Sequence, residues 1–265
     1  MLGKYELPSL SSSMINLLGL LRDPETPMSE VATQVEMDPG LTVRILRLIN
    51  SAGFGLMTQV SNLQHAVSLL GRSRLESLVL TFAATDRIPV RMECLETGRF
   101  WSAAARRATL ARVVAQHLHA ATQAEAFTAA LLHDIAVPVL ASANPAGYAD
   151  LLEFWRSNEE ARLDLLEQEL FGFDHARVGA LMAEDWGLPE YLVQAIAGHH
   201  EPVGQTAPDP AVRLVSRLRY WPESDPTEGI KKVAEEEFGI DPPLFDEMIA
   251  RSNADAEAFA GMFYE

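Results

Sequence analysis

The stretch DPGLTVRILRLINSAGF, residues 38–54, begins with the pattern of a short, capped helix. Its large apolar side chains recur every three or four residues and share one helix face: Leu41, Ile45, Leu48 and Ile49. Asp38 offers a capping oxygen directly before Pro39, whose nitrogen needs no hydrogen-bond acceptor at the first helical position. We interpret Asn50 as a C-terminal cap or a buried polar anchor in preference to a ligand, because asparagine tolerates unusual backbone angles.

The same helical period continues on both sides of this stretch. It covers residues 14–21, 63–70 and 75–82, and the Asp-Pro start signal returns at residues 209–210, 225–226 and 241–242. Ser61 with Gln64, and Thr122 with Glu125, have the spacing of capping boxes. No run alternates apolar and polar residues with period two. The sequence therefore predicts an all-α protein, a compact bundle of many short helices.

The amino-acid composition of the chain argues against several classes of function. The chain has 265 residues, of which 48% are apolar, and a net charge of −16 that is concentrated in residues 123–265. So acidic a half repels phosphate backbones, and we expect no nucleic-acid partner. Cys94 is the only cysteine, which excludes an internal disulfide and a thiolate zinc cluster. No apolar run approaches the length of a membrane span and the start lacks a leader pattern, so we expect a cytoplasmic protein without a membrane partner.

Histidines and one aspartate form the candidate chemical site. His133 and Asp134 follow an apolar run, His175 precedes an apolar helix, and His199 and His200 end another. Imidazole and carboxylate groups are natural ligands of a hydrolytic divalent metal. The alternative is that each is a buried, hydrogen-bonded structural residue. The spacing does not show that these segments converge.

The chain resembles the HDOD domain, a member of the HD phosphohydrolase superfamily used in bacterial signalling. The motifs that carry the resemblance are LPSL at 7–10, the opening stretch at 38–54, SNLQHAVSLLG at 61–71, LLHDI at 131–135, WGLP at 186–189 and HHEP at 199–202. It spans about residues 5–220 as one unit. It implies a two-lobed multi-helix bundle, with an N-terminal lobe at 1–95 and, at 96–265, an HD-domain-like lobe carrying acidic C-terminal helices.

The resemblance also implies a metal-ligand set that this chain only partly carries. Active superfamily members use a histidine, a His-Asp pair and a late aspartate. The first and last of these positions align with Ala103 and Ser216, neither of which supplies a strong ligand. The residual pocket would keep His133, Asp134, His175, His199 and His200. We expect Asp134 to pair instead with His133, His199 or a nearby arginine in a salt-bridge network.

A second candidate surface is basic. Arg44 and Arg47 lie three apart on one expected helix, and Arg72 and Arg74 flank another helix start. These four side chains are candidates for binding an acidic partner, a phosphorylated receiver or a nucleotide. The alternative is an ordinary solvated face.

The sequence favours a non-catalytic HDOD-type regulatory protein that acts by protein–protein interaction. The resemblance implies partners from two-component or cyclic-dinucleotide signalling, and we expect no cofactor, no bound metal and no enzymatic activity. One alternative is a divergent metal-dependent phosphohydrolase using His133, Asp134, His199 and His200. Another is a sensor that holds a nucleotide or small anion in the degenerate pocket.

Overall fold

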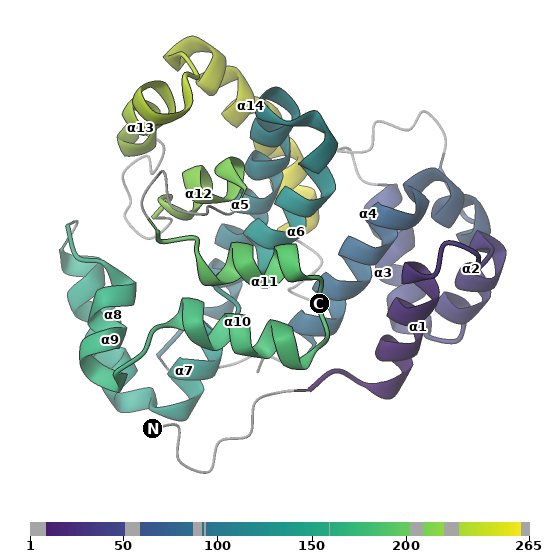
Figure 1. Ribbon diagram of the computed structural model, residues 1–265, viewed down its shortest axis with the longest axis horizontal. Helices are drawn as coiled ribbons and strands as arrows, with labels where there is room; N and C mark the ends of the chain where they lie inside the picture. Colours follow the sequence, from purple (N-terminus) through teal and green to yellow (C-terminus); the bar gives the residue numbers. More distant parts are fainter. Residues whose placement is uncertain are drawn as a thin grey trace.

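The computed structural model describes residues 9–50, 59–86, 92, 94–158, 160–201, 209–219 and 228–260. These residues form α-helices joined by short turns, and no strand occurs among them, so the all-α prediction is confirmed (Figure 1). Residues 7–8, 51–54, 202 and 225–226, which carry parts of the sequence motifs or a predicted helix start, lie outside the described residues.

The first four helices form the N-terminal lobe, on the right of Figure 1. They are α1 (Ser12–Arg22), α2 (Met28–Glu36), α3 (Pro39–Ile49) and α4 (Leu63–Thr85). Helices α1, α2 and α3 each pack against α4. Asp38 caps α3 as predicted, because its carboxylate accepts a hydrogen bond from the Leu41 amide at 3.0 Å. The long helix α4 therefore organises the lobe.

Gly71 interrupts α4. Its backbone angles of φ 72° and ψ 171° lie in a region that essentially only glycine occupies. Gly71 therefore introduces a kink inside one long helix. Directly after it, the Arg72 guanidinium donates hydrogen bonds to the carbonyl oxygens of Leu20, Leu21, Asp23 and Thr26. The kink thus fixes the end of α1 against α4.

The remaining helices build the second lobe. They are α5 (Thr97–Leu118), the 3-10 turn η2 (Ala120–Thr122), α6 (Gln123–Leu132), α7 (Val137–Ala143), α8 (Pro145–Ser157), α9 (Leu163–Phe171), α10 (His175–Asp185), α11 (Glu190–Ala197), α12 (Pro210–Ser216), α13 (Glu228–Phe238) and α14 (Pro242–Ala260). Helices α5 and α6 pack against each other at its centre, and α8 and α9 lie on the opposite side of the molecule from α1–α3 (Figure 1).

The capping predictions divide by residue type. The carboxylates of Asp209 and Asp241 accept backbone hydrogen bonds at the starts of α12 and α14, as expected. The predicted box at Ser61 is wrong, because Asn62 caps α4 by accepting from the His65 amide. The box at Thr122 is also wrong, since its side chain does not cap α6 and its hydroxyl donates to Asp209 at 2.8 Å.

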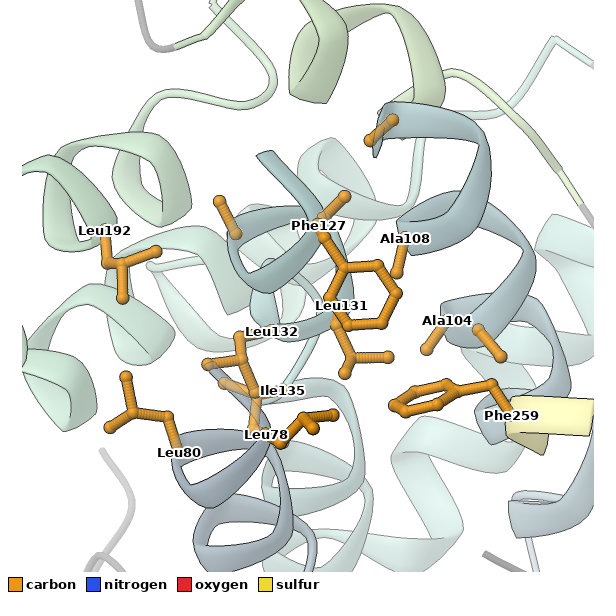
Figure 2. Packing of buried hydrophobic residues seen from close by; sticks show 14 of the residues in the cluster. Leu78, Leu80, Ala104, Ala108, Phe127, Leu131, Leu132, Ile135, Leu192 and Phe259 are labelled. Atoms are coloured by element: carbon orange, nitrogen blue, oxygen red, sulfur yellow. The ribbon is translucent and has the colours of Figure 1, made fainter. Parts of the chain in front are cut away.

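One hydrophobic core runs through both lobes. The second half of α4 packs on α6, and α6 packs on α5, so the buried side chains form one continuous cluster. Figure 2 shows this junction with Leu78 of α4, Ala108 of α5 and Leu131 of α6. Helix α14 adds Phe259, whose ring meets the Phe127 ring edge-on at 5.1 Å. The lobes are therefore packed together as one unit.

One stretch of the chain is apolar enough to span a membrane by length and composition alone. It is Ala120–Ala143, with a mean hydropathy of 1.6 in its most apolar window, 83% of which is buried inside the protein. The sequence expectation that no apolar run reaches such a length is therefore corrected. The stretch includes α6 and α7, and the turn between them carries the candidate site. This degree of burial is typical of a segment in the core of a folded protein.

Candidate functional site

The candidate residues stand at helix ends. His133 and Asp134 occupy the turn between α6 and α7, where Pro138 lies in the first turn of α7. His175 is the first residue of α10, and Asp174 caps that helix. His199 and His200 follow the C-terminal end of α11. At these helix ends the chain leaves the regular spacing of about 100° per residue, so the adjacent residues His133 and Asp134 can reach the same site.

The structure brings all five predicted pocket residues together, with three of the histidines around one oxygen of Asp134. Asp134 Oδ1 lies 3.2 Å from His175 Nε2, 3.5 Å from His133 Nε2 and 3.6 Å from His199 Nε2. His200 Nε2 is 3.0 Å from His175 Nε2. His133, His175 and His199 are each at most 2% exposed. The histidine cluster defined by these five residues is therefore a buried polar centre.

Backbone carbonyls fix the orientation of two imidazoles. His133 Nδ1 donates to the Ala130 oxygen and His199 Nδ1 donates to the Ile196 oxygen, each at 2.7 Å. Each Nε2 therefore presents a lone pair toward Asp134 in the neutral imidazole. Metal-binding histidines are commonly oriented in this way. Burial lowers the pKa of His133 to about 3, so this ring is neutral at pH 7.

His175 is the charged member of the histidine cluster. Its Nδ1 lies 2.6 Å from Glu167 Oε2, and its amide also donates to that oxygen at 2.7 Å. The Tyr148 hydroxyl donates to the other oxygen of Glu167. Burial alone would lower the pKa of His175, but Glu167 and Asp134 outweigh burial and hold that pKa well above its ordinary value. His175 is therefore an imidazolium between two carboxylates.

Arg107 supplies the second positive charge. Its Nη1 donates to Asp134 Oδ2 at 2.5 Å, while Nε and Nη2 donate to the Leu218 oxygen at 3.1 and 2.7 Å. Burial opposes ionisation of Asp134, but the Arg107 guanidinium and the hydrogen bond from His175 hold the pKa of Asp134 well below its usual range. The expected pairing of Asp134 with an arginine is therefore present.

The two predicted lost ligand positions face the same space. Ala103 and Ser216 line a cavity of about 500 Å³ together with Asp134 and His199. Ala103 has only a methyl group. The Ser216 hydroxyl donates to the carbonyl oxygens of His199 and Arg213, each at 2.9 Å. Neither side chain completes a ligand set around the histidine cluster.

The residues present fit a hydrolytic metal centre poorly. Two groups of three have donor atoms close enough for one ion: His133 with Asp134 and His199, and His175 with His199 and His200. A metal at the second group would require the loss of the His175 proton, which Glu167 and Asp134 stabilise. At the first group, Arg107 already neutralises the Asp134 carboxylate. Together with the adjacent Glu167 and Arg107, the cluster has two carboxylates facing two cations, so its charges are balanced.

The predicted basic patch is distributed over different structural roles. Arg44 pairs with Asp86 at 2.6 Å, and Arg72 donates to four backbone carbonyls as described above. Arg47 is exposed on α3. Arg74 lines a small cavity that also contains Leu48 and Phe259. Arg44 and Arg72 thus have partners within the protein, and the four arginines do not share one role.

Sequence reasoning missed the residues that surround the histidine cluster. Arg107, Tyr148 and Glu167 belong to no motif and come from three separate helices. Further arginines line the cavity, and among them are Arg156, Arg162, Arg213 and Arg219. The one signal in the sequence was Asp134 itself, because a buried carboxylate needs a positively charged partner. The sequence did not show which arginine supplies that charge.

Known proteins support the family resemblance. A protein from Treponema pallidum (strain Nichols), described as uncharacterized, is 26% identical over 196 residues, which are 74% of this chain and 38% of that protein. The chain thus spans about two fifths of that relative's length. A structure from Shewanella amazonensis SB2B, provisionally named a phosphohydrolase, is 24% identical with a TM-score of 0.78, covering 97% of this chain and 95% of that one.

A structure from Marinobacter aquaeolei VT8, provisionally named a signal transduction protein, is 22% identical with a TM-score of 0.76. It covers 98% of this chain and 60% of that one. At such identities the two structures show a shared helical fold. The HDOD domain family model matches residues 7–202, which is most of the chain. The chain belongs to the HDOD domain family.

Proposed function

We propose that this protein is a non-catalytic HDOD regulatory module that acts by binding other proteins in a bacterial signalling pathway. Membership of the HDOD family supports this proposal, as does the provisional name of the Marinobacter aquaeolei VT8 protein. The partners would come from two-component or cyclic-dinucleotide signalling. The acidic surface of the second half disfavours nucleic acid as a partner.

The observation that carries the proposal is the contact between Arg107 and Asp134. Its Nη1–Oδ2 distance of 2.5 Å places a guanidinium against the carboxylate that a hydrolytic metal would need. Ala103 and Ser216 supply no replacement ligand in the same cavity. A resident cation on Asp134 competes with an incoming metal ion for the same negative charge. Hydrolysis by the histidine cluster is therefore disfavoured.

Elemental analysis of protein purified without added metal tests the proposal. We expect less than about a tenth of an equivalent of iron, manganese, nickel or zinc. We also expect no turnover of a chromogenic phosphodiester with any of these metals added. Near one or two equivalents of metal, together with turnover, would contradict a non-catalytic role. His133→Ala and Asp134→Ala are the matched variants, since both remove donor atoms of the same group.

One observation favours the alternative, a divergent metal-dependent phosphohydrolase. His133 and His199 keep the orientation of metal ligands, since each Nδ1 contacts a backbone carbonyl and each Nε2 faces Asp134. Under this alternative, His133→Ala and Asp134→Ala abolish both hydrolysis and metal binding while circular dichroism shows an intact helical fold. Unchanged metal content in these variants would show that any metal is bound elsewhere.

A further inference from the structure

The cavity beside the histidine cluster is locally basic within an acidic half of the chain. Seven arginines line it, five of them from residues 123–265, against four carboxylates, whereas residues 123–265 as a whole carry a net charge of −18. Apolar side chains, including Phe100, Leu152 and Trp155, complete its walls. Its volume of about 500 Å³ is in the range of pockets for small organic ligands. The composition points to an anionic ligand with an apolar part.

Several of these arginines have partners within the protein. Arg162 pairs with Asp164 at 2.5 Å, and Arg217 pairs with Glu237 at 2.7 Å. Arg219 donates to the Asn158 oxygen at 3.0 Å and lies 4.4 Å above the centre of the Trp155 ring. These contacts hold the guanidinium groups in place around the cavity. The ion pairs neutralise part of the positive charge beside the cavity.

Arg213 differs from these neighbours. Its residue is only 4% exposed, yet its Nε and Nη2 atoms have no hydrogen-bond partner in the part of the chain that the structure describes. It projects from α12, the helix that ends at Ser216, and lines the cavity. A buried charged donor without an acceptor is costly, and native proteins rarely retain one without a reason. The missing acceptor is therefore a clue to a ligand.

We propose that Arg213 anchors a binding site for the phosphate group of a small phosphorylated organic molecule, about the size of a mononucleotide. The planar guanidinium donates through two parallel N–H groups, which match two phosphate oxygens. The surrounding arginines add positive charge, and the apolar walls receive the organic part. Since Arg213 is so deeply buried, a small molecule fits this position better than a phosphorylated side chain on a partner protein.

This binding site goes beyond the proposed function. The residues that form it are inferred from the structure alone and would be the same if the protein were an enzyme. The proposed function adds one element, namely that the bound phosphate ester is held without being cleaved. A ligand bound in this way would act as a signal that stabilises one state of the protein.

The test compares inorganic phosphate, AMP and adenosine as probes in phosphate-free buffer. We expect AMP and phosphate to raise the melting temperature of the wild-type protein and adenosine to leave it unchanged. Arg213→Met should weaken AMP binding by at least about tenfold in calorimetry, because it removes a charge-assisted donor pair. The AMP affinity of Arg213→Lys should lie between the affinities of the wild-type protein and Arg213→Met. Arg177→Met is the matched control, since Arg177 is exposed on α10, and should bind AMP like wild type.

Three results would overturn the site. They are no effect of phosphate or AMP at millimolar concentration, an equal effect of adenosine and AMP, or equal AMP binding by wild type and Arg213→Met. If Arg213→Met does not fold, Arg213→Lys decides the same question. Chromatography of AMP after incubation separates the two proposals: intact AMP that is bound supports both, whereas cleaved AMP supports the site and contradicts the non-catalytic role.

Discussion

At the scale of single residues, Asp134 depends on Arg107 for its charge. The side chains of Arg107 and Asp134 are 10% and 16% exposed, so the pair is largely shielded from water. Removing one member of a buried ion pair leaves the other charge uncompensated. Arg107→Met should therefore lower the free energy of unfolding by about 3–5 kcal/mol, measured by urea denaturation.

Arg106→Met provides the control for this prediction. Arg106 is the neighbouring residue on α5 and is exposed. Its replacement should change the free energy of unfolding by less than about 0.5 kcal/mol. The double variant Arg107→Met with Asp134→Asn should recover part of the loss, because no buried charge remains unpaired. A loss as small for Arg107 as for Arg106 would show that Asp134 has other compensation.

Two neutral histidines predict sensitivity to acid. Burial lowers the pKa of His133 to about 3, and burial together with His199 lowers the pKa of His200. An unfolded histidine has a pKa of about 6.5, so below that pH the unfolded chain binds protons that the folded protein does not. Each histidine then costs about 1.4 kcal/mol of stability per pH unit. His200→Gln should reduce the slope between pH 6 and pH 5 by that amount in urea titrations.

His175 predicts the opposite trend in alkali. Its folded pKa lies well above its unfolded value, so its contribution to stability is complete below about pH 6.5 and is lost as pH rises toward the folded pKa. His175→Gln should abolish this alkaline decline in urea titrations from pH 7 to pH 9. An unchanged decline in the variant would assign it to another group. Stability is therefore expected to be greatest near pH 6.5.

The sequence predicted the members of the histidine cluster but not its chemistry. His133 and Asp134 stand in a recognisable motif, and His175 stands directly before an apolar helical pattern. Arg107, Glu167 and Arg213 do not, because a charge partner on another helix leaves no periodic trace in the sequence. Only packing shows which arginine reaches Asp134, and that the Nε and Nη2 atoms of Arg213 find no acceptor among the described residues.

At the scale of elements, Gly71 sets the course of α4. Nothing lies within 4 Å of a Cβ added there, so the only obstacle to a side chain is the backbone conformation. Gly71→Ala should cost about 1–3 kcal/mol in the free energy of unfolding. Gly19→Ala is the matched control, since Gly19 is also open but lies in regular helix, where alanine should stabilise by about 0.5–1 kcal/mol. Equal effects at both sites in urea denaturation would show that the kink tolerates side chains.

Helix existence was easier to predict from the sequence than helix ends. The apolar period identified α1, α3 and both halves of α4, because burial of one face leaves a regular spacing. Capping depends on which of several adjacent polar residues has the right backbone angles. Asn62 therefore caps α4 in place of Ser61, and the Thr122 hydroxyl donates to Asp209, the capping residue of α12. The neighbouring residues in the sequence do not show whether a polar side chain will bond to the local backbone or to a distant partner.

At the scale of the whole molecule, Phe259 of α14 lies beside the junction of the two lobes. Helix α14 packs along α5, and Asp255 pairs with Arg112. Phe259 is 2% exposed and lines the small cavity that includes Leu48 of α3. Phe259→Ala should lower the free energy of unfolding by about 3–5 kcal/mol while both lobes still unfold in one transition.

Phe154→Ala is the control for the interlobe prediction. Phe154 is also aromatic but is 53% exposed on α8, so its loss should shift the transition by less than about 0.5 kcal/mol. Two separate transitions for Phe259→Ala, followed by fluorescence and circular dichroism, would show that the lobes hold together only through α14. The continuous core through α4 and α6 argues for one transition.

If the protein has the non-catalytic role that we propose, the position of Arg107 makes a return to hydrolysis depend on several simultaneous changes. Ala103 lies one helical turn before Arg107 on α5, so a histidine restored at 103 would meet a resident positive charge. An aspartate restored at 216 would offer that guanidinium a second carboxylate. Removing Arg107 first would leave Asp134 unsupported in the interior. A histidine at 103 and the loss of Arg107 are thus each unfavourable alone, while an aspartate at 216 would bind Arg107 more firmly in place. Under the proposed role the three changes are coupled by epistasis, and hydrolysis would require them together.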